Sequence, residues 1–587
     1  MKWSGRFVGY TIQSLRRDLV AGLIVGVVAI PLAMSFAIAS GVKPQYGIYT
    51  TIVAGFLISL FGGSKFQIGG PTGAFVPILL GIVLQYGYEN LLIAGMIAGV
   101  ILILMGIFKL GILIQFIPRP VTIGFTSGIA VIIFSGQIAN FLGLQHIKSH
   151  EYFLSNMKEI GTHLSTWNVY SALTAVICLA VLLFLPRILP KLPASLAGLI
   201  VSSVIASIFF SGKIATIGST YGMIPDTLPK FSMPHLSLDI IIQLLPAAFV
   251  IAMLGGIESL LSAVVADGMT GSRHHSNREL IGQGIANVVT PLFGGIPATG
   301  AIARTATNIK NGAASPISGM IHGLVVLSVL VLLAPFASTI PLSSMAPILM
   351  VVAWNMSERK EFVHVLKTKS SDSIVLIITF LLTVLTSLTT AVEVGLALAV
   401  IIFVIRMRDI LTVTKVLPDP SMKNEKVKPY MVNENHDCPQ ISIYTIEGPL
   451  FFGAADMFQK SIMDSTSSHV RVLLLRFGKV PFMDATGEAN LARIVQHVKN
   501  SGGTVLFSAM QSQPKAYMRK TGLDLRIGTE HFFDHTGEAI SFALGKLNDN
   551  KCLGCSHFAF RECTALSSSK DGSKVITYID KSRSVDL

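Results

Sequence analysis

The chain has 587 residues, of which 51% are hydrophobic and only 13% are charged, and its formal net charge is +13. Soluble proteins carry about 25% charged residues, so most of this chain cannot face water. The basic excess lies beside apolar segments and not on a soluble patch, which argues against a nucleic-acid partner. Cys178 is the only cysteine before residue 438, which excludes a secreted protein built on disulfides.

The density of charged residues rises near residue 411, which divides the chain into two parts. Charged residues number 38 in residues 1–411 but 39 in the much shorter remainder, residues 412–587. We therefore predict an α-helical membrane domain over 1–411, a polar linker over 412–440, a soluble domain over 441–545 and a polar, cysteine-containing tail over 546–587.

The apolar runs are long enough to cross a bilayer, which takes about 20 residues. They predict fourteen membrane segments, at 19–38, 46–62, 71–86, 90–108, 121–141, 168–186, 194–211, 238–266, 277–292, 299–311, 316–335, 342–357, 373–390 and 392–408. An even number places both termini on one side, and the loops on that side hold 18 Lys and Arg against five on the other. The positive-inside rule then predicts a multi-pass protein of the cytoplasmic membrane with both termini in the cytoplasm.

An internal repeat points to a site. A shift of 227 residues aligns Thr72-Gly73-Ala74 with Thr299-Gly300-Ala301 and the first segment with the eighth. Seven segments per unit require that the second copy is inverted in the membrane. Glycine and proline precede the third and tenth segments, as expected of half-helices whose N-terminal ends bind an anion. The alternative is that these small residues only allow close helix packing.

Two charges inside the apolar segments are candidate site residues. A charge there costs about 2.5–3.5 kcal/mol, so it marks function by default. Arg304 lies about one turn into the tenth segment and can supply a fixed positive charge to the anion. Glu258 lies in the middle of the eighth segment, with Ser262 one turn later, and can carry a coupling ion. Because no GxxxxGK[ST] loop is present, we expect a gradient and not ATP to supply the energy, and no enzyme activity.

Several motifs resemble the sulfate permease (SulP) family of anion transporters. They are the first segment VAGLIVGVVAIPLAMSFAIASG, the half-helices GGPTGAF and PATGAIARTATN, and the helix GGIESLLSAVVADGMTG. The resemblance implies a 7+7 inverted repeat, usually in a homodimer. Its core domain (segments 1–4 and 8–11) moves like an elevator against a gate domain (segments 5–7 and 12–14). It implies secondary active transport of a small inorganic anion or carboxylate, such as sulfate, bicarbonate or a dicarboxylate. An uncoupled channel or exchanger, a sodium-coupled bicarbonate symporter and a membrane-anchored regulator are the alternatives.

The resemblance also assigns an anion site to positions of this chain: Leu32, Phe36, Gly73, Ala74, Phe75, Gly300, Ala301, Ala303 and Arg304. Leu32 stands where many members have glutamine. Ile302 stands where sodium-coupled members have a threonine that binds the cation. Since isoleucine offers no oxygen, we expect Glu258 to carry a proton and not to bind sodium.

The soluble part alternates short strands and helices from residue 441, which predicts an α/β domain. It resembles the STAS domain, in which a serine of an Asp-Ser-Ser/Thr-Gly segment is phosphorylated. This chain has Asp484-Ala485-Thr486-Gly487 instead, so a phosphorylation switch has only Thr486, and the alternative is that Asp484 or Thr486 caps the helix. The tail contains Cys552, Cys555 and Cys563. The Cys-x2-Cys spacing, with His557 before Cys563, leaves zinc as an alternative. Because structural zinc sites need four ligands, we predict unligated thiols, no metal and no cofactor.

Overall fold

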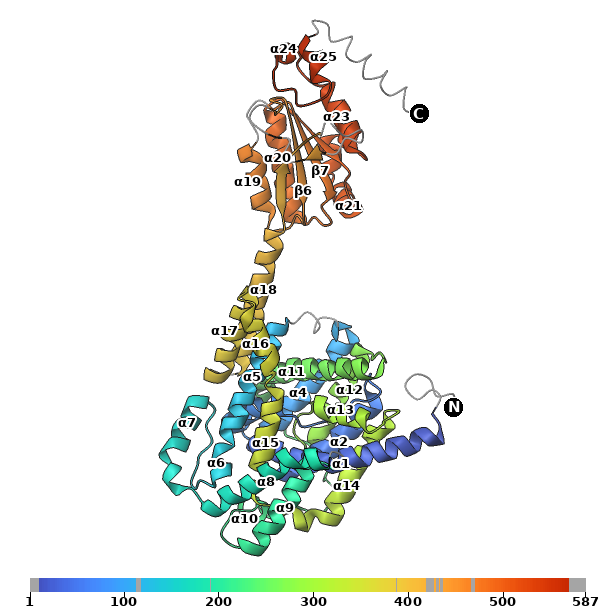
Figure 1. The fold of residues 1–587 in the computed structure, drawn as a ribbon. Coiled ribbons are helices and arrows are strands. Elements are labelled where there is room, and N and C mark those ends of the chain that lie inside the picture. Colours follow the sequence, from blue (N-terminus) through green and yellow to red (C-terminus); the bar gives the residue numbers. More distant parts are fainter. Residues whose placement is uncertain are drawn as a thin grey trace. The chain divides into compact units, whose positions relative to one another are not determined.

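The computed structural model describes residues 10–111, 118–189, 192–227, 229–386, 388–418, 427–428, 432, 436–465 and 470–568. Residues 569–587 of the predicted tail lie outside this range. The chain forms two compact units, Met1–Ala399 and Val400–Leu587 (Figure 1). The division falls within a helix, ahead of the boundary that we predicted at residue 411.

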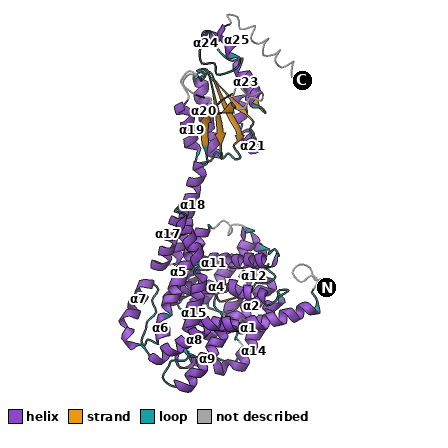
Figure 2. Ribbon diagram, viewed as in Figure 1, coloured by secondary structure: helices purple, strands orange, loops and turns teal. Residues whose placement is uncertain are grey.

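The first unit is built from helices (Figure 2). A helix coincides with each predicted membrane segment. They are α1 (Ile12–Ala39), α2 (Pro44–Phe61), α3 (Val76–Tyr86), α4 (Tyr88–Ile107), α5 (Arg119–Gly136) with α6 (Ile138–Leu142), α8 (Val169–Ile188), α9 (Ala194–Phe209), α11 (Leu238–Thr270), α12 (Ser276–Val289), α13 (Ile302–Lys310), α14 (Ile317–Ala337), α15 (Leu342–Met356), α17 (Ser371–Leu385) and α18 (Leu388–Asp409). Within the described residues, seven helical spans are long and apolar enough to cross a membrane.

Three further helices lie between the predicted segments: α7 (Phe153–Thr162), α10 (Ile217–Tyr221) and α16 (Arg359–Lys367). Hydropathy did not predict them because α7 and α16 carry several polar and charged side chains and α10 is very short. In the core of the unit, α1 packs on α14 and α4 packs on α12. Helices α4 and α12 meet at Gly99 and Gly284, where an added Cβ on either glycine would lie within 2.7 Å of the other's carbonyl oxygen. Small residues therefore permit this close contact.

Two extended segments from distant parts of the chain form a short ladder. Strand β1 (Gly69–Gly70) pairs antiparallel with β2 (Thr299–Gly300). The 3-10 turn η2 (Gly73–Phe75) and helix α3 follow β1, and helix α13 follows β2. The two short helices predicted from the repeated motif are therefore present, and the ladder holds their N-terminal ends near one another.

The second unit contains a five-stranded sheet in the order β3-β6-β7-β8-β9. Its strands are β3 (Thr412–Lys415), β6 (Ile441–Glu447), β7 (Val472–Lys479), β8 (Thr504–Ser508) and β9 (Phe532–Phe533). Strand β3 is antiparallel to β6, and the other neighbours are parallel. The predicted α/β domain is confirmed. Strand β3 lies in the range that we predicted to be linker. The sequence did not reveal it because four residues are too few to give a clear alternating pattern.

Both faces of this sheet are covered. One face packs against α19 (Ala455–Ser465), α20 (Ala485–Asn500), α21 (Ser512–Thr521) and α22 (Leu523–Ile527). The other packs against α23 (Thr536–Leu544) and part of the segment that follows it. Alternate residues of β7 serve the two faces, with Leu473 and Leu475 in one core and Val472 and Leu474 in the other. This alternation is the period of a strand buried on both sides.

Candidate functional site

A cavity of about 400 Å³ lies where the two short helices begin. It is lined by residues from α1, η2, α5, α11, α13 and α15. Predicted site residues that line it are Leu32, Phe36, Gly73, Ala74, Glu258, Ala301, Ala303 and Arg304. Residues from both halves of the sequence are therefore brought together at one cavity.

The N-terminal ends of both short helices lack a side-chain cap. Thr72 precedes η2 in an extended conformation, but its hydroxyl donates to the Glu258 carboxylate (2.9 Å) and accepts nothing from the helix. Ala301 precedes α13 and has no side chain that could accept a hydrogen bond. The first N–H groups of a helix have no partner within the helix, and the end carries a partial positive charge. This end of the cavity is therefore suited to an anion.

Arg304 adds a full positive charge to the same cavity. Its side chain is buried, and its Nη2 donates to the carbonyl oxygen of Pro71. Its Nη1 is buried and has no hydrogen-bond partner in the described part of the chain. Gly70 makes room for the guanidinium, since an added Cβ would lie 2.6 Å from Nη1 and the φ angle there is +149°. The arginine is thus fixed through one nitrogen and keeps a donor for a ligand.

Glu258 lies midway along α11 and lines the same cavity as Arg304. Ser262, one turn further on, is placed differently. Its hydroxyl donates to Thr305 Oγ1 (3.2 Å), which also accepts from the Ile68 N–H (3.0 Å). Ser262 is not among the cavity residues, so it joins α11 to α13 behind the site. Its role in binding a coupling ion stays a prediction.

Two other predicted residues support the cavity without lining it. Phe75 packs towards α11, where an added Cβ on Gly255 would lie 3.1 Å from its ring. The N–H of Gly300 donates to Ser259 Oγ (3.0 Å), so this amide already has a partner. An added Cβ on Gly300 would overlap Gln67 Nε2 at 1.7 Å, so the glycine is needed for packing.

Polar residues that the sequence reasoning missed also line the cavity. Thr122 and Thr126 come from α5, Asn355 from α15, and Glu358 from the residue that precedes α16. None of them belongs to a repeated motif. The signal that could have found Asn355 and Thr126 is a polar side chain inside a long apolar segment.

In the second unit, Asp484 caps α20. Its carboxylate accepts from the N–H of Gly487 (2.8 Å) and from that of Phe452 (2.9 Å). The helix-cap interpretation of Asp484 is therefore confirmed. Thr486 is exposed on the first turn of α20. A regulatory role for Asp484 and Thr486 stays a prediction.

Comparisons with known proteins agree with this architecture. The Sulfate permease family model matches residues 15–379, and the STAS domain model matches residues 431–539. The chain is 56% identical to the putative sulfate transporter YvdB of Bacillus subtilis, over 92% of this chain and 99% of that protein. It is 28% identical to the bicarbonate transporter BicA of a Picosynechococcus strain, over 91% and 95% of the two chains.

Solved structures give the same result for the fold. Murine Slc26a9, an anion transporter in an inward-facing state, matches with a TM-score of 0.83 and 19% identity, over 91% of this chain and 92% of that chain. The transmembrane domain of a cyanobacterial BicA matches with a TM-score of 0.59 and 29% identity, over 67% and 98%. The protein is therefore a multi-pass helical membrane protein with a C-terminal STAS domain. It belongs to the sulfate permease family, which confirms the resemblance seen in the sequence.

Proposed function

We propose that this protein is a secondary active transporter that carries a small anion such as sulfate, bicarbonate or a dicarboxylate across the cytoplasmic membrane. The observation that carries the proposal is the cavity at which Arg304 and the uncapped ends of η2 and α13 meet. Relatives described as a putative sulfate transporter and a bicarbonate transporter support this class of substrate.

Anion binding rests on two sources of positive potential. The free Nη1 donor of Arg304 can make a charged hydrogen bond to the anion, and the first N–H groups of η2 and α13 can complete its coordination. Leu32 and Phe36 contribute apolar surface to the cavity and offer no competing charge. The site therefore selects small anions mainly by charge and size.

Coupling rests on Glu258. A carboxylate in an apolar helix is costly when charged and far cheaper when it holds a proton. An anion bound in the same cavity repels the carboxylate, so anion and proton favour each other's binding, and linkage makes that preference mutual. Ile302 also lines the cavity and has no oxygen for a sodium ion. We therefore propose proton–anion symport.

The remaining features of the transport cycle are part of the same proposal. The first unit works as a 7+7 inverted repeat whose core moves like an elevator against the gate, in a homodimer with both termini in the cytoplasm. The second unit regulates or assembles the transporter, with Asp484 and Thr486 in its regulatory segment. The pairing of β1 with β2 supports the repeat, because the corresponding motifs of the two halves lie side by side.

The test is uptake of radiolabelled sulfate, bicarbonate and a dicarboxylate into proteoliposomes under imposed pH or sodium gradients. The unmodified protein should accumulate at least one of these anions when the pH gradient drives protons inward. Glu258→Gln should still exchange the anion but lose proton-driven accumulation. Glu361→Gln is the matched control, because this exposed glutamate of α16 does not line the cavity; it should keep accumulation.

Accumulation that follows a sodium gradient and ignores the pH gradient would contradict proton coupling. Equal loss in both glutamine variants would mean that Glu258 has no special role. Absence of uptake and exchange of all three anions by folded protein would contradict the substrate class.

A further inference from the structure

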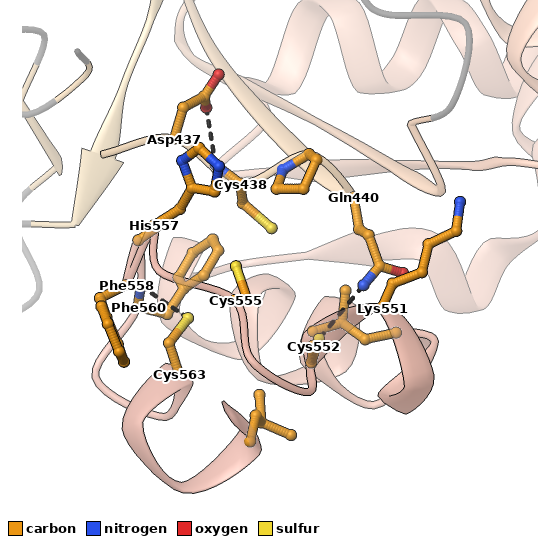
Figure 3. Close-up of a pocket in the computed structure, with 14 residues that line it drawn as sticks. Asp437, Cys438, Gln440, Lys551, Cys552, Cys555, His557, Phe558, Phe560 and Cys563 are labelled. Carbon is orange, nitrogen blue, oxygen red and sulfur yellow. Dashed lines mark hydrogen bonds between the residues drawn. The ribbon is translucent and has the colours of Figure 1, made fainter. Parts of the chain in front are cut away.

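Four of the five cysteines meet at one end of the STAS domain. Cys438 precedes β6, Cys552 ends α24 (Asp549–Cys552), Cys555 follows three residues later, and Cys563 begins α25 (Cys563–Ser568). All four line one small cavity of about 20 Å³, room for roughly one water-sized occupant. Figure 3 shows Cys438, Cys555 and Cys563 turned towards the space between the entry to β6 and the tail, with Cys552 beside Gln440. The fourth thiol that the tail alone lacks therefore comes from the segment that leads into β6.

The tail is built into the domain at this point. Ala559, Phe560 and Leu566 are buried in the apolar core that also contains Ile441 and Cys438. Gln440 holds the tail through its amide group, which accepts from the N–H of Asn548 (2.9 Å) and donates to the carbonyl oxygen of that residue (3.3 Å). The cysteines are thus brought together by packing on both sides of the cavity.

The local turn suits a pair of metal ligands. The N–H of Cys555 donates to the carbonyl oxygen of Cys552 (3.1 Å), and Gly554 takes a φ angle of +72°, which glycine adopts without strain. A Cys-x₂-Cys turn of this kind places two sulfurs on one side of the chain, which is the ligand spacing of structural zinc sites.

Hydrogen-bond donors already surround three of the sulfurs. Gln440 Nε2 donates to Cys552 Sγ (3.3 Å), and the N–H of Phe560 donates to Cys563 Sγ (3.3 Å). The N–H groups of Gln440 and Ile441 act on Cys438 in the same way. Donors of this kind stabilise a thiolate and are the partners that orient metal ligands.

Lys551 lines the same cavity, but its single positive charge cannot balance four thiolates. Burial raises the pKa of the Cys438 and Cys552 thiols and raises that of Cys563 to about 11, and the neighbouring cysteines raise each of them further. A divalent cation reverses this preference, since it binds thiolates directly. Within the described residues, no group of three His, Cys, Asp or Glu side chains is already arranged to hold a metal ion. A metal therefore has to draw the sulfurs together, and each cysteine can turn about its single χ1 bond.

We propose that Cys438, Cys552, Cys555 and Cys563 form a closed, tetrahedral Zn²⁺ site that fastens the tail to the entry of β6. Four sulfur ligands in a tetrahedral arrangement select zinc among the common divalent ions, and a site with four protein ligands is structural and not catalytic. As each S–Zn bond forms, one S–H bond breaks and its proton passes to solvent, while the oxidation states of sulfur and zinc do not change.

The test uses the full-length protein, purified in detergent under reducing conditions and supplied with Zn²⁺. Metal content per chain is measured by inductively coupled plasma mass spectrometry after gel filtration. We expect one tightly held zinc ion per chain, and its loss in Cys438→Ser and in the double variant Cys552→Ser/Cys555→Ser. Cys178→Ser is the matched control, because this buried thiol lies in the membrane unit and donates to the Ser344 carbonyl oxygen (3.2 Å). That variant should keep its zinc.

His557 tests the identity of the ligands. It lines the same cavity, and its buried Nδ1 has no hydrogen-bond partner in the described part of the chain. His557→Ala should keep the zinc. Loss of zinc in His557→Ala together with retention in Cys552→Ser would overturn the four-cysteine assignment.

A measurement on the unmodified protein covers the case in which cysteine variants fail to fold. Co²⁺ bound in place of zinc should give the intense visible bands and sulfur-to-metal charge-transfer bands of a tetrahedral thiolate site. X-ray absorption of the zinc form should give sulfur neighbours at about 2.3 Å. A weak octahedral cobalt spectrum, zinc that remains in Cys438→Ser, or fully reduced thiols with no bound zinc would overturn the proposal. Disulfides among these cysteines in protein purified without reductant, with no zinc bound, would overturn it in favour of a redox pair.

Discussion

The N-terminal end of α20 in the STAS domain and those of η2 and α13 in the membrane unit are built in opposite ways. In the STAS domain, the N–H of Gly487 at the start of α20 is bound by the Asp484 carboxylate. In the membrane unit, the residues before η2 and α13 provide no side-chain cap, and Thr72, which could do so, gives its hydroxyl to Glu258. A capped end is stable but has fewer donors left for a ligand, whereas an uncapped end keeps them at a cost in helix stability. The difference separates a helix end used for folding from one available for binding.

The largest effect on transport is expected at Arg304, whose charge lies beside the uncapped ends of η2 and α13. Arg304→Ala should raise the KM for anion uptake tenfold to hundredfold, because the loss of a charged hydrogen bond costs about 1.5–3 kcal/mol. Initial uptake rates in proteoliposomes over a range of anion concentrations measure this. Arg304→Lys keeps the charge but loses the planar guanidinium, so its KM should lie between that of Arg304→Ala and that of the unmodified protein. An unchanged KM in folded Arg304→Ala would show that Arg304 does not bind the anion at the N-terminal ends of η2 and α13.

A smaller effect is expected when the charge is kept and its position is disturbed. The added methyl group in Gly70→Ala would lie 2.6 Å from Arg304 Nη1 and should displace the guanidinium. We expect the KM to rise by up to about tenfold, the cost of weakening one charged hydrogen bond without removing it. Gly268→Ala on α11 is the control, because no atom lies within 4 Å of its added Cβ. Gel filtration of both variants checks folding, and equal affinities would mean that the position of Arg304 is not critical.

The smallest effect on transport is expected at the capped end. Asp484→Ala removes the acceptor for two backbone N–H groups and should destabilise α20 by about 1–2 kcal/mol, a factor of roughly 5–30 in local opening. Hydrogen exchange of α20 peptides, followed by mass spectrometry on the full-length protein, measures the change. Asp484→Asn keeps a capping oxygen and should exchange nearly as slowly as the unmodified protein. A KM that changes with Asp484→Ala as much as with Arg304→Ala would erase the distinction between the two kinds of helix end.

Much of this architecture could be predicted from sequence because its signals are local. Long apolar runs predicted the membrane helices, and the motifs around Gly73 and Gly300 predicted the two short helices that begin at the cavity. Polar helices such as α16 could not be predicted from hydropathy, and β3 was too short to show the alternating pattern of a strand. The pairing of β1 with β2 could not be predicted, because four residues carry no alternating pattern.

The candidate site shows the same limit. Glu258 and Arg304 were found because a charge in an apolar segment is a signal in itself. Asn355 and Thr126 reach the cavity from elements with no recognisable motif, so only the packing of α5 and α15 places them there. Cys438 was likewise separated from the tail cysteines by most of the STAS domain. Contacts made by folding, and not by spacing along the chain, decide all three cases.

The ladder between β1 and β2 has a consequence for protein engineering. Gly69 pairs with Gly300 and Gly70 with Thr299, so the two segments that open the short helices are built as a single unit from widely separated parts of the gene. Gly300 also packs against Gln67, so a side chain added at this glycine would collide with the Gln67 side chain. Exchange of one segment alone between members of the family would pair mismatched halves. Substrate preference should therefore be transferable between relatives only when both segments are replaced together.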